Sequence, residues 1–128
     1  MEFFAAWSDT SPAYTNIEMN ANGASLIALG PDRYSRTRID SLLDKPFPVK
    51  AEIGEESWSV TVHIPLADLA KLYKIDASRF APGYSFRGNF YKCGDETAVE
   101  HYGMWNRVEL PAPDYHCPAF FGKLTITA

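Results

Sequence analysis

The most regular alternation of apolar and polar residues lies in the segment 57–65, SWSVTVHIP. Trp58, Val60, Val62 and Ile64 fall on one side of an extended chain, and serine, threonine and histidine fall on the other. A period of two is typical of a half-buried strand. The preceding VKAEI alternates in the same way, and the GEES between the two segments is typical of a hairpin turn. We therefore predict a β-hairpin over residues 49–64.

The pattern changes to a helical one directly after this hairpin. Leu66, Leu69, Ala70 and Tyr73 recur at the spacing of one helical stripe. Pro65 stands where proline is favoured, near the first turn of a helix. One short helix near 65–73 is expected, and no other segment shows this periodicity.

The remaining apolar runs are short and are separated by turn residues. They are EFFAAW (2–7), YTNIEMN (14–20), ASLIAL (24–29), YSFRGNFYKCG (84–94) and GKLTIT (122–127). Turn chemistry separates strands in NANG, LGPDR, FAPG and PAPD. Seven or eight strands and one helix in 128 residues predict a single all-β domain, 1–128, built as an antiparallel β-sandwich or jelly roll.

The first strand begins almost at residue 1, which is unusual for a sheet protein. Two explanations stay open. Either further N-terminal strands belong before Met1, or the strand is an edge strand that a homodimer partner or an adjoining domain covers.

Two of the predicted strands carry many polar side chains on one face. Every second residue of a strand points to the same side. The polar residues that share a side in this way are Asn16, Glu18 and Asn20 in one strand, and Arg87, Asn89 and Tyr91 in the other. Asparagine is a poor strand former, so these faces are unusual for mere contact with solvent. Within one sheet they would form a polar platform suited to the paired hydroxyls of a sugar. The alternative is a solvated surface with cross-strand pairs such as Glu18 with Arg87.

The overall charge narrows the classes of ligand. A formal charge of −4 argues against sequence-independent binding of nucleic acid and against a basic membrane surface. No apolar run approaches the ~20 residues of a transmembrane helix. The start of the chain, MEFFAAWSD, has no signal-peptide pattern, so localisation is open, and an extracellular or periplasmic place is expected if the domain is excised from an exported protein. Two cysteines, Cys93 and Cys117, favour buried thiols over a disulfide framework.

Four segments keep the order and character of one known family. They are EFF followed by YTNIEMNANG, then SWSVTVHIPLADL, FRGNFYKCG and MWNRVELPAPDYHCPAFFGKLTI. The last segment joins Trp105, a proline-rich loop, the pair Tyr115 and His116, and an aromatic-Gly-x-Leu closing strand. Together, from Glu2 to Ile126, they resemble the carbohydrate-binding module family 9-like domains, which are β-sandwiches of the wider DOMON-like class.

This resemblance implies a non-catalytic module that binds an oligo- or polysaccharide and serves polysaccharide utilisation. By the same resemblance, Trp105 would stack on a sugar ring, and Glu2, Arg87 and Asn89 would bind its hydroxyls. The full set of candidate carbohydrate-binding residues is Glu2, Asn16, Glu18, Asn20, Arg87, Asn89, Tyr91 and Trp105. Calcium holds loops in the family, and the candidate oxygen ligands here are in CGDETAVEHY, although this segment lacks the spacing of a calcium loop and is also typical of a solvated hairpin tip.

Other functions have weaker support. A glycosidase needs two carboxylates across a cleft, and nothing in the sequence raises the pKa of Glu2 or Glu18. The chain could also be an interaction or accessory domain of a glycoside-active or redox protein. Met104 and His116 are the haem ligands to consider, because some DOMON-like domains hold haem. His116 in PDYHCP is more simply explained as the hydrogen-bonded tether of a loop.

Overall fold

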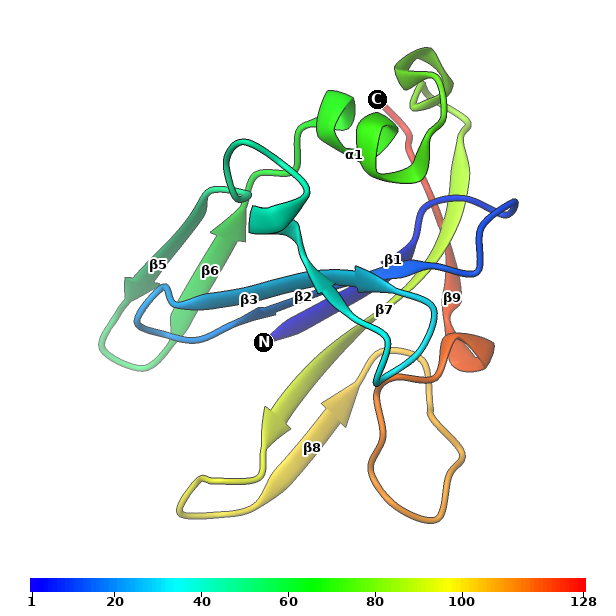
Figure 1. The fold of residues 1–128 in the computed structure, drawn as a ribbon. Helices are drawn as coiled ribbons and strands as arrows, with labels where there is room; N and C mark the ends of the chain where they lie inside the picture. The colour runs from blue at the N-terminus through cyan, green and yellow to red at the C-terminus, as the bar shows by residue number, and fades with distance from the viewer.

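Seven strands form one antiparallel sheet in the computed structural model, which describes residues 1–128 (Figure 1). The order across the sheet is β4-β3-β2-β1-β7-β8, and β9 pairs with β7 beyond the end of β8. The strands are β1 (Glu2–Ala6), β2 (Tyr14–Met19), β3 (Ser25–Gly30), β4 (Thr37–Arg38), β7 (Ser85–Gly94), β8 (His101–Met104) and β9 (Gly122–Thr125). All neighbours in this sheet are antiparallel.

A second layer lies on one side of this sheet. It consists of the hairpin β5 (Val49–Ile53) and β6 (Trp58–Val62), followed by α1 (Leu66–Tyr73) (Figure 1). The helix turns Leu69 and Tyr73 inward, and Lys74 ends it in the left-handed conformation with φ of 54°. None of the helices has the length and apolar character needed to cross a membrane.

The main core fills the space between the sheet and this layer. Alternation along β1 directs Ala5 and then Trp7 toward α1, while Phe4 points to the other side. The buried members are Ala5, Trp7, Ile17, Ile27, Ile39, Leu43, Phe47, Leu69, Tyr73 and Phe80. The Trp7 indole N–H donates to Thr15 Oγ1 at 3.0 Å, so this polar atom is satisfied within the core.

The opposite face of the sheet is also covered over part of its area. The segment between β8 and β9, orange in Figure 1, crosses this face and contributes Tyr115 and Phe121 to a second core with Phe4, Tyr14 and Tyr91. We call residues 105–121 the covering segment. It decides which polar side chains of the sheet stay accessible.

The predicted all-β sandwich with one short helix is confirmed, and so are the hairpin and the five further strands. Two strands were not predicted, because β4 has only two residues and β8, HYGM, has no clear alternation. The edge position considered for the first strand is wrong. β1 pairs with β2 on one side and with β7 on the other. Its backbone is therefore fully paired and needs no partner to cover it.

Candidate functional site

The sheet brings the predicted polar faces of β2 and β7 to one side, with β1 between them. Glu18 lies opposite Glu2 on β1, and Glu2 lies opposite Tyr91 on β7. At the next pair of positions on the same face, Phe4 of β1 lies opposite Asn16 of β2 on one side and opposite Asn89 of β7 on the other. The two polar strands are thus not neighbours, but they share a face.

Three of the candidates are buried, and the covering segment packs on two of them, Asn89 and Tyr91. Asn16, Asn89 and Tyr91 retain 2%, 0% and 1% of their exposure. The Asn89 amide donates to Asn106 O at 2.8 Å, and its oxygen accepts from Asn106 N at 2.8 Å. Asn89 therefore fixes the start of the covering segment.

Asn16 connects a half-buried arginine, Arg36, to Glu18. The Asn16 Nδ2 donates to Glu18 Oε1 at 2.8 Å, while its Oδ1 accepts from Arg36 Nη2. Arg36 also donates to the carbonyls of Gly30 and Tyr14 at 2.7 and 3.0 Å, and its guanidinium lies 4.2 Å from the Tyr14 ring centroid. Burial lowers the pKa of Arg36. This chain of contacts orients the Glu18 carboxylate.

A cavity of about 320 Å³ remains open beside the covering segment, above Glu2 and Glu18. Its lining residues are Glu2, Glu18, Arg33, Cys93, Asp95, Tyr102, Pro113, Tyr115 and His116. An adjoining groove of about 520 Å³ shares Glu2, Glu18 and Cys93 with the cavity and extends to Asn20, Leu26, Arg38 and Trp58. We call the first space the glutamate cavity.

Neither of the two glutamates forms an ion pair. The ion pairs of the protein are Arg33–Asp114, Arg38–Asp40, Lys50–Glu52 and Arg107–Glu109, and none includes Glu2 or Glu18. Burial, and then the charge of Glu18, raises the pKa of Glu2 to about 7. No pattern in the sequence indicates this shift of the pKa. Near neutral pH, Glu2 is present in both its protonated and its ionised form, so it can donate or accept a hydrogen bond.

His116 anchors the wall of the glutamate cavity. Its Nδ1 lies 2.8 Å from the Tyr14 hydroxyl, and its ring centroid lies 4.8 Å from that of Phe4. Burial, followed by the charges of Arg36 and Arg33, lowers the pKa of His116 to about 4. The ring is therefore neutral at neutral pH, and the prediction that His116 tethers a loop is confirmed.

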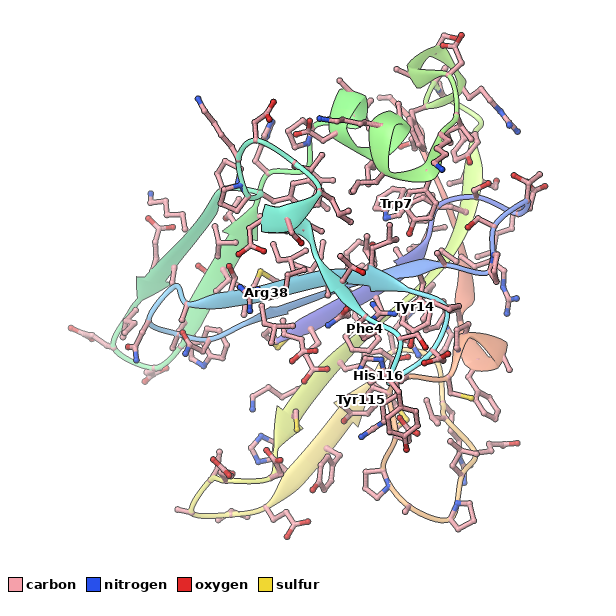
Figure 2. The ribbon with its side chains drawn as sticks, in the orientation of Figure 1. Phe4, Trp7, Tyr14, Arg38, Tyr115 and His116 are labelled. Carbon is pink, nitrogen blue, oxygen red and sulfur yellow. The ribbon has the colours of Figure 1, made fainter.

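Tyr115 completes this anchor. It stacks on Tyr91 with ring centroids 4.1 Å apart, and its hydroxyl donates to Lys92 O at 3.2 Å. Figure 2 shows Phe4, Tyr14, Tyr115 and His116 gathered on one side of the sheet and Trp7 on the other. The wall of the glutamate cavity is thus held by aromatic contacts.

Arg87, Trp105 and Asn20 are predicted site residues that do not line the glutamate cavity. Arg87 donates to the carbonyls of Ala119 and Phe121 at 3.3 and 3.0 Å, on the far side of the covering segment. Trp105 is 53% exposed and packs edge-on against Phe90 at 5.9 Å, and Phe90 alternates with Asn89 and Tyr91 along β7.

Asn20 caps the turn after β2. Its oxygen accepts from the backbone N–H of Asn22 and of Ala24, both at 3.0 Å, and the residue lines the groove. The alternative pairing of Glu18 with Arg87 is wrong, because the partners of Glu18 across the sheet are Glu2 and Leu26.

Sequence reasoning did not find Arg33, Asp95 and Tyr102 as parts of this site. Arg33 comes from the turn after β3, and Tyr102 comes from the unpredicted β8. Only the pairing of β7 with β8 and the folding back of the turn bring them to Glu2. No local signal in the sequence points to either placement.

The residues present do not fit a calcium or haem site. Histidine, cysteine and acidic side chains gather nowhere in a group of three that could hold a metal ion. Asp95 Oδ1 accepts from Glu96 N at 3.1 Å, and His101 Nδ1 lies 2.8 Å from Val99 O, within the hairpin between β7 and β8. Met104 Sδ accepts from Val108 N at 3.1 Å, and the Nδ1 of His116 is engaged with Tyr14. Cys93 and Cys117 are free thiols.

Residues 1–126 match the sequence model of carbohydrate-binding family 9. The chain belongs to this family. Its fold is similar to the crystal structure of a candidate carbohydrate-binding protein from Bacteroides uniformis ATCC 8492, with a TM-score of 0.74 and 28% sequence identity. That similarity covers 97% of this chain and 59% of the other, so the chain spans about three fifths of that protein's length. No curated protein is significantly similar to the chain.

Proposed function

We propose that this family 9 protein binds a short saccharide in the glutamate cavity, as a non-catalytic module accessory to polysaccharide use. The observation that carries the proposal is the pair Glu2 and Glu18. Both side chains line a cavity of about 320 Å³, and neither forms an ion pair with a cation of the protein. Cavities of this size suit small ligands, and a few fixed polar groups then set the orientation of the ligand.

Each lining residue has a distinct part in this proposal. Glu18, held by Asn16, accepts hydrogen bonds from sugar hydroxyls, and Glu2 accepts or donates according to its protonation. Arg33 is held in place by Asp114 at 2.7 Å and offers its remaining N–H groups to ring or hydroxyl oxygens. Tyr102 supplies the aromatic surface for the C–H face of the sugar.

The arrangement of the carboxylates favours binding over hydrolysis. Glycosidases place their two carboxyl groups on either side of the scissile bond. Glu2 and Glu18 instead project side by side from paired positions of neighbouring strands. Glu18 also uses one oxygen to accept from Asn16. Both groups therefore belong to the floor of the cavity.

Calorimetric titration with cello-, xylo- and manno-oligosaccharides tests this proposal. Glu18→Gln and Arg33→Gln should weaken binding of the active sugar about tenfold, since each removes a charged hydrogen-bonding group. Glu55→Gln, in the exposed turn of the β5–β6 hairpin, is the matched control and should bind normally. Absence of heat with every sugar would sink the proposal.

Two further measurements separate this site from the alternatives. Trp105→Ala should leave binding unchanged, and a loss of binding in that variant would move the site to the other face of the sheet. Release of reducing ends from any of the sugars, abolished by Glu2→Gln, would show an enzyme instead of a binding module.

A further inference from the structure

A second cavity, of about 640 Å³, lies on the other side of the covering segment from the glutamate cavity. Its walls come from the turn between β1 and β2, from the start of β7, from β9 and from the end of the covering segment. It shares no lining residue with the glutamate cavity. We call it the arginine cavity.

Two cations stand side by side in the arginine cavity. Arg87 on β7 lies directly opposite Lys123 on β9, and both line the cavity. Like charges in directly opposed positions destabilise a sheet. Neither residue belongs to an ion pair, and Asp9, the single acidic lining residue, pairs with neither. The net charge of the lining is +1, from two cations and one anion.

The guanidinium of Arg87 is fixed and still has free donors. Its Nη2 donates to the carbonyls of Ala119 and Phe121, while Nε and Nη1 have no hydrogen-bond partner in the protein. A positioned planar fork next to an ammonium group is suited to a carboxylate, which accepts two parallel N–H bonds.

The rest of the lining suits a sugar better than a small inorganic anion. Pro12 and Pro118 give apolar surface, of the kind that covers the C–H face of a sugar ring. Ser11 adds a half-buried hydroxyl group to the lining. A free phosphate would gain nothing from the apolar walls.

We propose that the arginine cavity is a second binding site, which takes the carboxylate of an acidic sugar, a uronic acid, on Arg87 and Lys123. This goes beyond the function proposed above, because the site uses other residues and a different ligand charge. Neutral sugars bind in the glutamate cavity, where the lining is acidic. The covering segment separates the two sites.

The test is calorimetric titration of the whole chain with trigalacturonate, with cellotriose as the neutral counterpart and with inorganic phosphate. Trigalacturonate should bind, and its Kd should rise about tenfold in Lys123→Gln, since one charged donor is lost. The Kd of the parent protein for trigalacturonate should also rise between 20 mM and 200 mM salt, because salt screens the attraction between exposed charges. Lys71→Gln, an exposed lysine of α1, is the matched control and should bind like the parent.

Lys123 donates no side-chain hydrogen bond that its replacement would break, and an unchanged unfolding midpoint in Lys123→Gln would confirm an intact fold. Absence of binding by trigalacturonate, or equal binding by the parent and Lys123→Gln, overturns the proposal. Phosphate binding as tightly as trigalacturonate also overturns it, because the site would then take any anion. Glu18→Gln should leave the uronate affinity unchanged, so that failure of this site and failure of the glutamate cavity are distinguishable.

Discussion

Glu2 and Glu18 lie directly opposite each other on neighbouring strands, and no cation of the protein forms an ion pair with either. Like charges in such positions repel each other, and burial adds to this cost for Glu2. Groups whose pKa is shifted by burial and by a neighbouring charge are concentrated at functional sites. The arrangement also makes the stability of the protein depend on pH.

Glu2→Gln should make the free energy of unfolding less dependent on pH. The pKa of Glu2 is about 7 in the folded protein against 4.5 in the unfolded chain. Between these values the folded state binds more protons, so the stability contributed by Glu2 is present below pH 4.5 and is lost as the pH rises toward 7. After allowance for solvent screening, we expect a loss of about 1 to 2 kcal/mol.

Urea unfolding at pH 5 and at pH 7.5 measures this loss. The parent should lose stability between the two pH values relative to Glu2→Gln, and Glu55→Gln should behave like the parent. A parent protein and a Glu2→Gln variant with the same pH profile would contradict the shifted pKa.

His116→Gln should change the pH profile in the opposite sense. The pKa of His116 falls from 6.5 to about 4 on folding, so the unfolded chain binds the extra proton in this range. The stability that His116 contributes is therefore present above pH 6.5 and is lost as the pH falls toward 4. The variant should show less acid destabilisation than the parent.

The same variant loses the contact with Tyr14, which should cost about 1 kcal/mol at neutral pH. His63→Gln is the control, because His63 is exposed at the end of β6. Acid unfolding curves of the two variants check this prediction. Coincident curves would rule out His116 as the source of the loss of stability at acid pH.

Strand parity in the sequence predicted which side chains share a face, and the structure shows why it could not predict which of them are accessible. Asn16, Glu18, Asn89 and Tyr91 do lie on one side of the sheet. Parity is a local property of an extended chain, so it survives folding. Burial of Asn89 and Tyr91 depends instead on a segment far along the chain.

The position of β1 shows the same limit. Its proximity to the start of the chain left an edge position as one of two explanations, but its neighbour β7 begins more than 75 residues later. Pairing between distant segments leaves no local trace in the sequence. The resemblance to family 9 is confirmed by the match over residues 1–126, whereas Arg33 and Tyr102 reach the glutamate cavity only through such distant pairing.

Arg36→Lys should destabilise the protein by about 2 kcal/mol, because the ammonium group of lysine cannot replace the fork of hydrogen bonds at this half-buried position. Arg36 donates to the carbonyls of Gly30, Tyr14 and Ala28 as well as to Asn16. Sugar binding in the glutamate cavity should weaken too, since Asn16 then holds Glu18 less firmly. Urea unfolding and calorimetry measure the two effects.

Arg38→Lys is the control for this change. The Arg38 side chain is 57% exposed and its ion pair with Asp40 spans 3.5 Å, so its replacement should alter stability by less than about 0.5 kcal/mol. Equal effects of the two substitutions would show that Arg36 has no special part in the fold.

Gly30→Ala should destabilise the turn that carries Arg33 and Arg36. A Cβ at position 30 would lie 1.9 Å from the backbone oxygen of Ser35 and 2.9 Å from its carbonyl carbon. Backbone atoms cannot move aside as a flexible side chain can, so the turn must open, and we expect a cost of about 3 kcal/mol.

Displacement of Arg33 in Gly30→Ala should also reduce the affinity for sugar in the glutamate cavity. Gly103→Ala on β8 is the matched control, because its Cβ would meet Lys92 Cβ at an ordinary 3.4 Å and should leave stability nearly unchanged. Thermal unfolding and sugar titration of the two variants check this prediction, which fails if Gly30→Ala is as stable as Gly103→Ala and binds sugar as well.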